Sequence, residues 1–211
     1  SKPVIRDLKE LAALTSNSDG AQRIAWGPVW RKTRAWFTDK VKKELGLSVR
    51  RDSAGNNWVT LPGESRAGVI IGSHLDSVPN GGWLDGCFGV ITGLGALRRQ
   101  RAAGKPPVTI HLVDWADEEG ARFGRSLVGS SAAGGSLNPR KELSHLVDRA
   151  GTRMPDAMKE NGVDLNTMLR ARGELKKLGG KAYLEVHIEQ GPVLEQMKKS
   201  TAVVLGTFGV E

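Results

Sequence analysis

Apolar residues recur at helical spacing in three stretches of the chain. Residues 4–14 carry apolar side chains three or four positions apart, which predicts a helix packed against a core. Residues 28–45 repeat the pattern, with Pro28 where a first helical turn tolerates proline and Gly46 where the helix would end. Residues 86–103 form the third stretch. We therefore expect three long helices.

Short apolar runs predict the strands of an α/β fold. Residues 48–52 and 57–61 flank a turn with Gly55 and Asn56, two residue types that accept positive backbone dihedrals, so a hairpin is predicted. The other predicted strands cover residues 69–73, 108–114, 182–188 and 201–205.

The stretch from residue 129 to residue 180 has a weaker pattern. Small residues from Gly129 to Gly135 allow the backbone to approach another element or a ligand closely. Between residues 140 and 180 we expect two or three short helices, one of which starts at Pro155.

Polar side chains cluster directly after the predicted strands. His74 and Asp76 follow one strand, the acidic triplet 117–119 follows the next, and His187 lies at the end of a third. Side chains at the C-terminal ends of neighbouring strands in an α/β sheet converge on one crevice. Imidazole and carboxylate groups suit zinc, manganese, cobalt or nickel. The sequence therefore predicts a metal-dependent hydrolase.

The candidate ligands differ in what they can offer a metal. Two metals about 3.5–4 Å apart need a bridging group, and the two oxygens of Asp85 suit that task. His74 and His187 would fill one metal site, and Glu119 would serve the other.

Two further acidic residues have other predicted roles. Glu118 points away from its neighbour in the chain and would take a proton from the attacking water, while Asp76 would accept the second ring proton of His74. A lone histidine is more often a packing residue, and an acidic triplet is more often a helix start, but the ordered combination favours a site. His111, in a strand, and His145, in a surface helix, are not expected to be ligands.

Composition excludes several other classes of protein. The net charge of +8 comes from scattered basic residues without a nucleic-acid motif, so no nucleic-acid partner is expected. No apolar run approaches the roughly 20 residues that cross a bilayer, which predicts no membrane partner and a cytoplasmic protein. The single cysteine, Cys87, excludes an internal disulfide and is expected to pack at a helix start. The chain contains neither a Gly-x-Ser-x-Gly elbow nor a phosphate loop.

Several motifs together resemble a known family, and they are Trp36, the turn Asp52-Ser-Ala-Gly55-Asn56, and the segments Gly72–Gly89, Asp117–Gly124 and His187–Glu195. The chain resembles the hydantoinase/carbamoylase-type amidohydrolases of the M20 metallopeptidase superfamily. This resemblance implies a three-layer α/β/α sandwich with a mixed, mostly parallel sheet and two divalent metal ions. It also implies ligands at His74, Asp85 (bridging), Glu119 and His187, a general base at Glu118 and a substrate contact at Gln190.

The resemblance also implies an activity and a longer relative. The expected reaction is hydrolysis of an N-carbamoyl-L-amino acid to the amino acid, carbon dioxide and ammonia, with allantoate amidohydrolase or β-ureidopropionase as alternatives. A further alternative is a metal-binding fragment without catalysis, or one part of a split enzyme. Full-length relatives are expected to homodimerise through a lid domain. Residues 1–211 would be the N-terminal portion of the catalytic domain, without that lid domain, the C-terminal return and one further histidine ligand. Ser131 stands where relatives commonly carry arginine.

Overall fold

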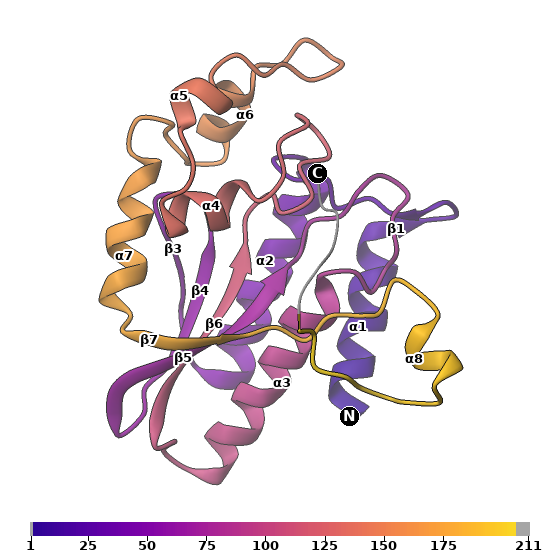
Figure 1. Ribbon diagram of the computed structural model, residues 1–211, viewed down its shortest axis with the longest axis vertical. Helices are drawn as coiled ribbons and strands as arrows, with labels where there is room; N and C mark the ends of the chain where they lie inside the picture. Colours follow the sequence, from indigo (N-terminus) through magenta and orange to yellow (C-terminus); the bar gives the residue numbers. More distant parts are fainter. Residues whose placement is uncertain (1, 206–211) are drawn as a thin grey trace.

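A five-stranded sheet forms the centre of the computed structural model, which describes residues 2–205 (Figure 1). Its strands, in spatial order, are β3 (Val49–Arg51), β4 (Asn57–Leu61), β6 (Val108–Trp115), β5 (Ser65–His74) and β7 (Gly180–Leu184). β4 is antiparallel to both of its neighbours, whereas β5 is parallel to β6 and β7. The sheet is therefore mixed, as predicted, and two of its four pairs of neighbouring strands are parallel.

Three long helices cover one face of the sheet, and they are α1 (Lys2–Thr15), α2 (Pro28–Leu45) and α3 (Cys87–Ala103). Their apolar residues pack with Val59, Leu112 and Ile71, which alternate along their strands with residues that face the other way. All three helices match the predicted segments within two residues at each end. α2 ends at Gly46, whose φ of 60° is a left-handed conformation that glycine adopts without strain.

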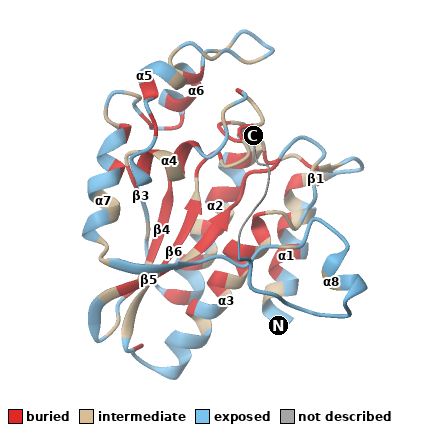
Figure 2. Cartoon of the chain, in the orientation of Figure 1, coloured by how far each residue is buried: buried red, intermediate tan, exposed pale blue. Residues whose placement is uncertain are grey.

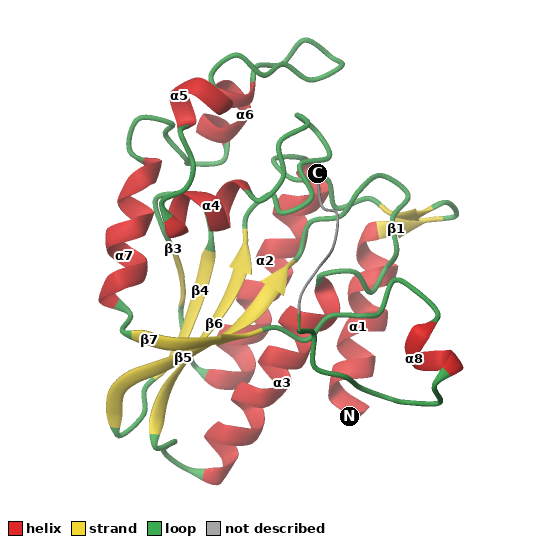
Figure 3. Cartoon of the chain, in the orientation of Figure 1, coloured by secondary structure: helices red, strands yellow, loops and turns green. Residues whose placement is uncertain are grey.

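Shorter helices form the third layer, in which α7 lies against the opposite face of the sheet and α5 and α6 lie beyond the strand ends (Figure 3). These helices are α4 (Val128–Gly134), α5 (Pro139–Glu142), α6 (Met154–Glu160), the 3-10 helix η1 (Met168–Arg170) and α7 (Ala171–Lys177). Trp58, Ile70 and Val113 point towards this side and pack with Leu175 and Leu178. The three-layer α/β/α sandwich is therefore confirmed. As expected, Pro155 lies in the first turn of a short helix.

A buried carboxylate joins the three long helices. Asp7 of α1 is fully buried, and its oxygens lie 3.0 Å from Lys40 Nζ on α2 and 2.6 Å from an Arg98 nitrogen on α3. Burial alone would raise the pKa of Asp7, but the two cations hold it below its ordinary value.

Near the C-terminal end of the described chain, one predicted strand is present with a different end and another is absent. The predicted strand 182–188 is the shorter β7, which ends at Leu184 and is exposed at every residue (Figure 2). Residues 201–205 form no strand and are exposed. Their β-branched residues favour an extended chain, but a strand also needs a hydrogen-bonding neighbour, and none lies beside them among residues 2–205.

Two smaller elements complete the described chain. A short hairpin consists of β1 (Ser16–Asn17) and β2 (Gly20–Ala21), and the helix α8 (Val193–Gln196) follows β7. No helix within residues 2–205 combines the length and the apolar character that crossing a membrane requires.

Candidate metal centre

The parallel pair β5 and β6 brings two of the predicted clusters to one edge of the sheet. His74 is the last residue of β5 and lies opposite Trp115, the last residue of β6. The loops that leave both strands therefore start side by side, as the rule for α/β sheets predicts.

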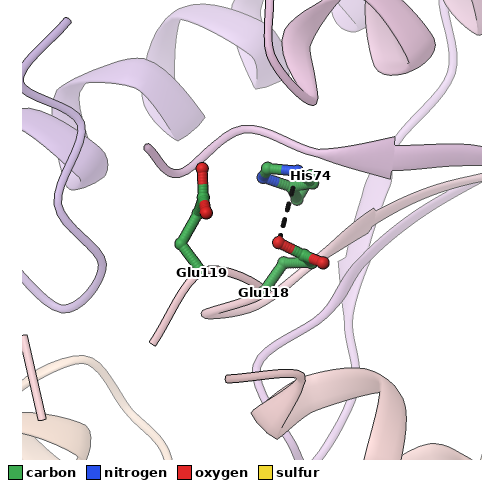
Figure 4. Close-up of side chains that lie close together, drawn as sticks. All are labelled: His74, Glu118 and Glu119. Carbon is green, nitrogen blue, oxygen red and sulfur yellow. Dashed lines mark ion pairs between the residues drawn. The ribbon is translucent and has the colours of Figure 1, made fainter. Parts of the chain in front are cut away.

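His74, Glu118 and Glu119 converge at this edge (Figure 4). One ligand atom from each lies within 4.8 Å of the others, and His74 Nε2 is 3.5 Å from Glu118 Oε2. His74 is buried, whereas both glutamates are partly exposed. An imidazole and two carboxylates are the donor set that borderline divalent metals prefer, so these residues fit such an ion.

The carboxylates at this edge perturb one another's protonation. Burial alone would lower the pKa of His74, but the hydrogen bond to Asp76 and the charges of the glutamates raise it to about 10. Burial raises the pKa of Glu118 and of Glu119, and the negative charge of Asp85 raises both further. A divalent cation would relieve this crowding of negative charge.

Asp76 holds the loop that carries both glutamates. Its two carboxylate oxygens accept hydrogen bonds from the backbone N–H groups of Glu118, at 3.2 Å, and Glu119, at 3.1 Å. Its Oδ1 is also 3.5 Å from His74 Nδ1, while its backbone oxygen is 3.2 Å from the same nitrogen. The hydrogen bond of the His74 ring therefore goes to the Asp76 backbone oxygen, with the carboxylate nearby, and that carboxylate also positions the glutamates, a role that sequence reasoning missed.

Residues from distant segments fix the start of the same loop. Asn56 Oδ1 accepts the Ala116 N–H at 2.9 Å, and Trp26 Nε1 donates to Asp117 Oδ2 at 2.6 Å. Asp117 is fully buried with a φ of 54°, and burial raises its pKa to about 8. No spacing pattern reveals these contacts, because the partners lie 60 and 91 positions apart.

Asp85, His187 and Gln190 form a second group. His187 Nε2 is 3.3 Å from Asp85 Oδ1, and Gln190 Nε2 donates to Asp85 Oδ2 at 2.7 Å. The structure thus brings these three predicted residues together across about a hundred positions of sequence. Among residues 2–205, the set of ligand atoms within 4.8 Å does not include Asp85 or His187. Asp85 is linked to the first group through its charge.

The loop between Asp85 and α3 passes close to the His74 imidazole. A Cβ at Gly86 would lie 2.4–2.5 Å from the His74 ring atoms, and the φ of Gly86 is +63°. Only glycine fits there without displacing the imidazole. The neighbouring Cys87 is buried, and burial raises the pKa of its thiol to about 12, in keeping with the predicted packing role.

A buried ion pair between Arg34 and Asp114 connects α2 to the ends of β5 and β6. Arg34 Nε of α2 donates to Asp114 Oδ2 at 2.7 Å, and both side chains are almost fully buried. Asp114 Oδ1 accepts the Leu75 N–H at 2.9 Å, one residue after His74. The pair therefore connects the helical layer to the start of the metal-site loop.

Comparison with known proteins places this chain in a family. The family described as Peptidase family M20/M25/M40 matches residues 70–204. An N-carbamoyl-L-amino acid amidohydrolase from Geobacillus stearothermophilus is 37% identical over 199 residues, which cover 92% of this chain and 47% of the relative. Allantoate amidohydrolase from Escherichia coli (strain K12) is 36% identical over 194 residues, which cover 90% and 46%.

A solved structure agrees with these relatives. A hydantoinase/carbamoylase family amidase from Burkholderia ambifaria superimposes with a TM-score of 0.78 and 32% identity, covering 92% of this chain and 47% of that one. The chain thus spans about half the length of the relatives it matches. It belongs to Peptidase family M20/M25/M40, and the predicted resemblance to the hydantoinase/carbamoylase-type amidohydrolases is confirmed.

Proposed function

We propose that this protein takes part in the metal-dependent hydrolysis of a non-peptide C–N bond. The observation that carries the proposal is the convergence of His74, Glu118 and Glu119 at the C-terminal ends of two parallel strands. Its relatives include amidohydrolases of N-carbamoyl-L-amino acids and of allantoate. The substrate we propose is an N-carbamoyl-L-amino acid, which would yield the amino acid, carbon dioxide and ammonia.

Allantoate and related ureido compounds are the second candidate substrate class, because the chain is almost equally similar to both kinds of relative. Identity to the allantoate amidohydrolase is 36%, against 37% for the N-carbamoyl-L-amino acid amidohydrolase. Allantoate and β-ureidopropionate carry the same ureido group, so the same catalytic residues would serve them.

Four side chains would hold two divalent ions, zinc, manganese, cobalt or nickel, and they are His74, Asp85, Glu119 and His187. Asp85 would bridge the two ions, because a carboxylate offers two oxygens, one for each ion. Bound metal would polarise the substrate carbonyl and lower the pKa of the attacking water.

Glu118 would act as general base and then as general acid. Burial raises its pKa towards neutral pH. A carboxyl group with such a pKa can both take a proton from water and return it to the leaving amine. Asp76 would keep Glu118 in place through the backbone N–H that it binds, and would hold the tautomer of His74. Gln190 would contact the substrate.

Residues 1–211 contribute His74, Asp85, Glu118, Glu119 and His187 to the proposed site. The relatives are about twice as long as this chain, and we extend the proposal to a cytoplasmic location and to homodimerisation of the whole protein. The competing proposal is a metal-binding fragment, or one part of a split enzyme.

The test combines metal content with ammonia release. The purified chain is supplied in turn with zinc, manganese or cobalt, and ammonia is measured with N-carbamoyl-L-methionine or allantoate as substrate. We expect Glu118→Gln to lower turnover by about 10²–10⁴-fold while metal content stays unchanged. His74→Ala should lower metal content, and Glu160→Gln, an exposed carboxylate on α6, should change neither.

Each outcome separates two of these proposals. Unaltered turnover in Glu118→Gln would remove this glutamate from the reaction. Metal uptake without turnover by the parent chain would favour the fragment or split enzyme.

A further inference from the structure

His187 and Gln190 lie on a segment without regular secondary structure. The ladder between β7 and β5 ends at the pair Leu184 and Ile71, and residues 185–190 belong to neither a helix nor a strand. The helix that follows, α8, buries none of its residues. Side-chain contacts must therefore hold the segment against the sheet.

Glu185 makes the contacts that join this segment to the sheet. One carboxylate oxygen accepts the Ser73 hydroxyl at 2.5 Å, and the other accepts the Tyr183 hydroxyl at 2.6 Å. The Tyr183 oxygen itself accepts the Trp115 indole N–H at 3.0 Å. Ser73 is on β5 and Trp115 is on β6, so one carboxylate ties residues 185–190 to the two strands that end at the metal centre.

The remaining side-chain contacts of this segment with the site would compete with metal. His187 Nε2 and Gln190 Nε2 each contact one oxygen of Asp85. Under the proposed function, these oxygens and His187 Nε2 are the atoms that would face the ions, because His187 Nδ1 already lies 2.7 Å from the Ile188 carbonyl oxygen. Glu185 directs both of its oxygens to hydroxyl groups, so its contacts are compatible with bound ions.

We propose that Glu185 is a positioning residue that sets the separation of the His74 and His187 imidazoles. The bond between Ser73 and Glu185 lies one residue before the first imidazole and two residues before the second. Loss of this bond would free the His187 side of the site while leaving the His74 side intact. This inference rests on the proposed function, because it assigns both imidazoles to metal binding.

The test compares Glu185→Gln with Glu195→Gln, an exposed glutamate of α8 on the same segment. Hydrogen–deuterium exchange of the backbone amides of residues 186–190, measured without metal, should become faster in the first variant only. Cobalt titration, followed by the visible absorption of histidine-bound cobalt, should show affinity about tenfold weaker in Glu185→Gln with unchanged stoichiometry. Tyr183→Phe, which keeps the Ser73 contact, should weaken affinity less.

A double variant identifies the route of the effect. Glu185→Gln should add nothing to the loss of cobalt affinity caused by His187→Ala, because the carboxylate acts through that imidazole. The proposal is overturned if Glu185→Gln leaves amide exchange or cobalt affinity unchanged, or if its loss of affinity adds to that of His187→Ala. Fewer cobalt ions bound at saturation would also overturn it, because Glu185 would then itself be a ligand. If the parent chain takes up no cobalt, the proposed function is refuted, and so is the role of Glu185 in metal binding. The exchange measurement would still test whether Glu185 fixes residues 186–190 to the sheet.

Discussion

Replacing Arg34 by methionine would leave a buried carboxylate without its cation. The Arg34 guanidinium is 2% exposed, donates to Asp114 from Nε at 2.7 Å, and also donates to the Gly55 carbonyl at 2.7 Å. Methionine keeps much of the apolar stem of arginine but removes the charge and every donor. Asp114 would then keep only neutral donors, from Asn57 and the Leu75 N–H.

The expected cost follows from the burial of both partners. Removing one member of a buried ion pair typically destabilises a protein by about 3–5 kcal/mol, because the remaining charge is uncompensated. A domain has only about 5–15 kcal/mol of stability in total, so Arg34→Met should remove a large share of it. Arg31→Met, on the exposed side of the same helix, should cost within about 0.5 kcal/mol.

The deficit should also depend on pH in a defined direction. Burial raises the pKa of Asp114 above its ordinary 3.8, and Arg34 opposes that rise. Without Arg34 the folded-state pKa moves higher, so the folded variant binds more protons than the unfolded chain above about pH 4. Its stability then falls as pH rises, by up to about 1.4 kcal/mol per pH unit.

Urea-induced unfolding at pH 5 and pH 8 measures both effects. We expect the free energy of unfolding of Arg34→Met to lie further below that of the parent chain at pH 8 than at pH 5. A loss no larger than that of Arg31→Met, or a loss that is equal at the two pH values, would show that the pair does not carry the stability assigned to it.

Other substitutions test separate parts of the structure. Gly129→Ala would place a Cβ 2.0 Å from Asn56 Oδ1, so it should lower the free energy of unfolding by about 1–3 kcal/mol. Gly134→Ala on the same helix meets nothing within 4 Å and should leave thermal unfolding unchanged. Equal losses in the two variants would contradict the close contact. Asp7→Asn should cost about 1–3 kcal/mol at pH 7. Because the pKa of Asp7 is lowered on folding, its contribution is present above the ordinary value of 3.8 and lost as pH falls below it, so the deficit in unfolding free energy should shrink at acid pH; a constant deficit would refute this.

The helices and the hairpin were predictable because their signals are local. Residues 28–45 have their periodic face, their proline and their terminal glycine within one segment, and the structure places α2 at these positions. Residues 185–188 and 201–205 are different, because the sequence predicted strands there and the structure has none. Their residue types favour an extended chain, but a strand forms only where a neighbouring strand offers its backbone groups, which no local pattern reveals.

The candidate site was predictable to a similar extent. His74 and the glutamates follow strands that are recognisable from their apolar runs, and the rule for parallel strands places them at one edge. The groups that hold them, such as Asn56, Trp26 and Glu185, could not be assigned in advance, since any buried polar residue offers the same donors or acceptors to many partners.

By itself, therefore, the sequence determined the three long helices, the hairpin and the two strands that lead to the site, the residue types available for metal chemistry and the edge of the sheet where they gather. Only the tertiary structure decided that Asp76 binds the backbone of both glutamates, that Arg34 neutralises Asp114, and that His187 lies beside Asp85. The physical reason is that periodicity and turn chemistry act within a few residues. Hydrogen bonds and ion pairs between distant segments depend on how the layers pack, and packing is a property of the whole fold.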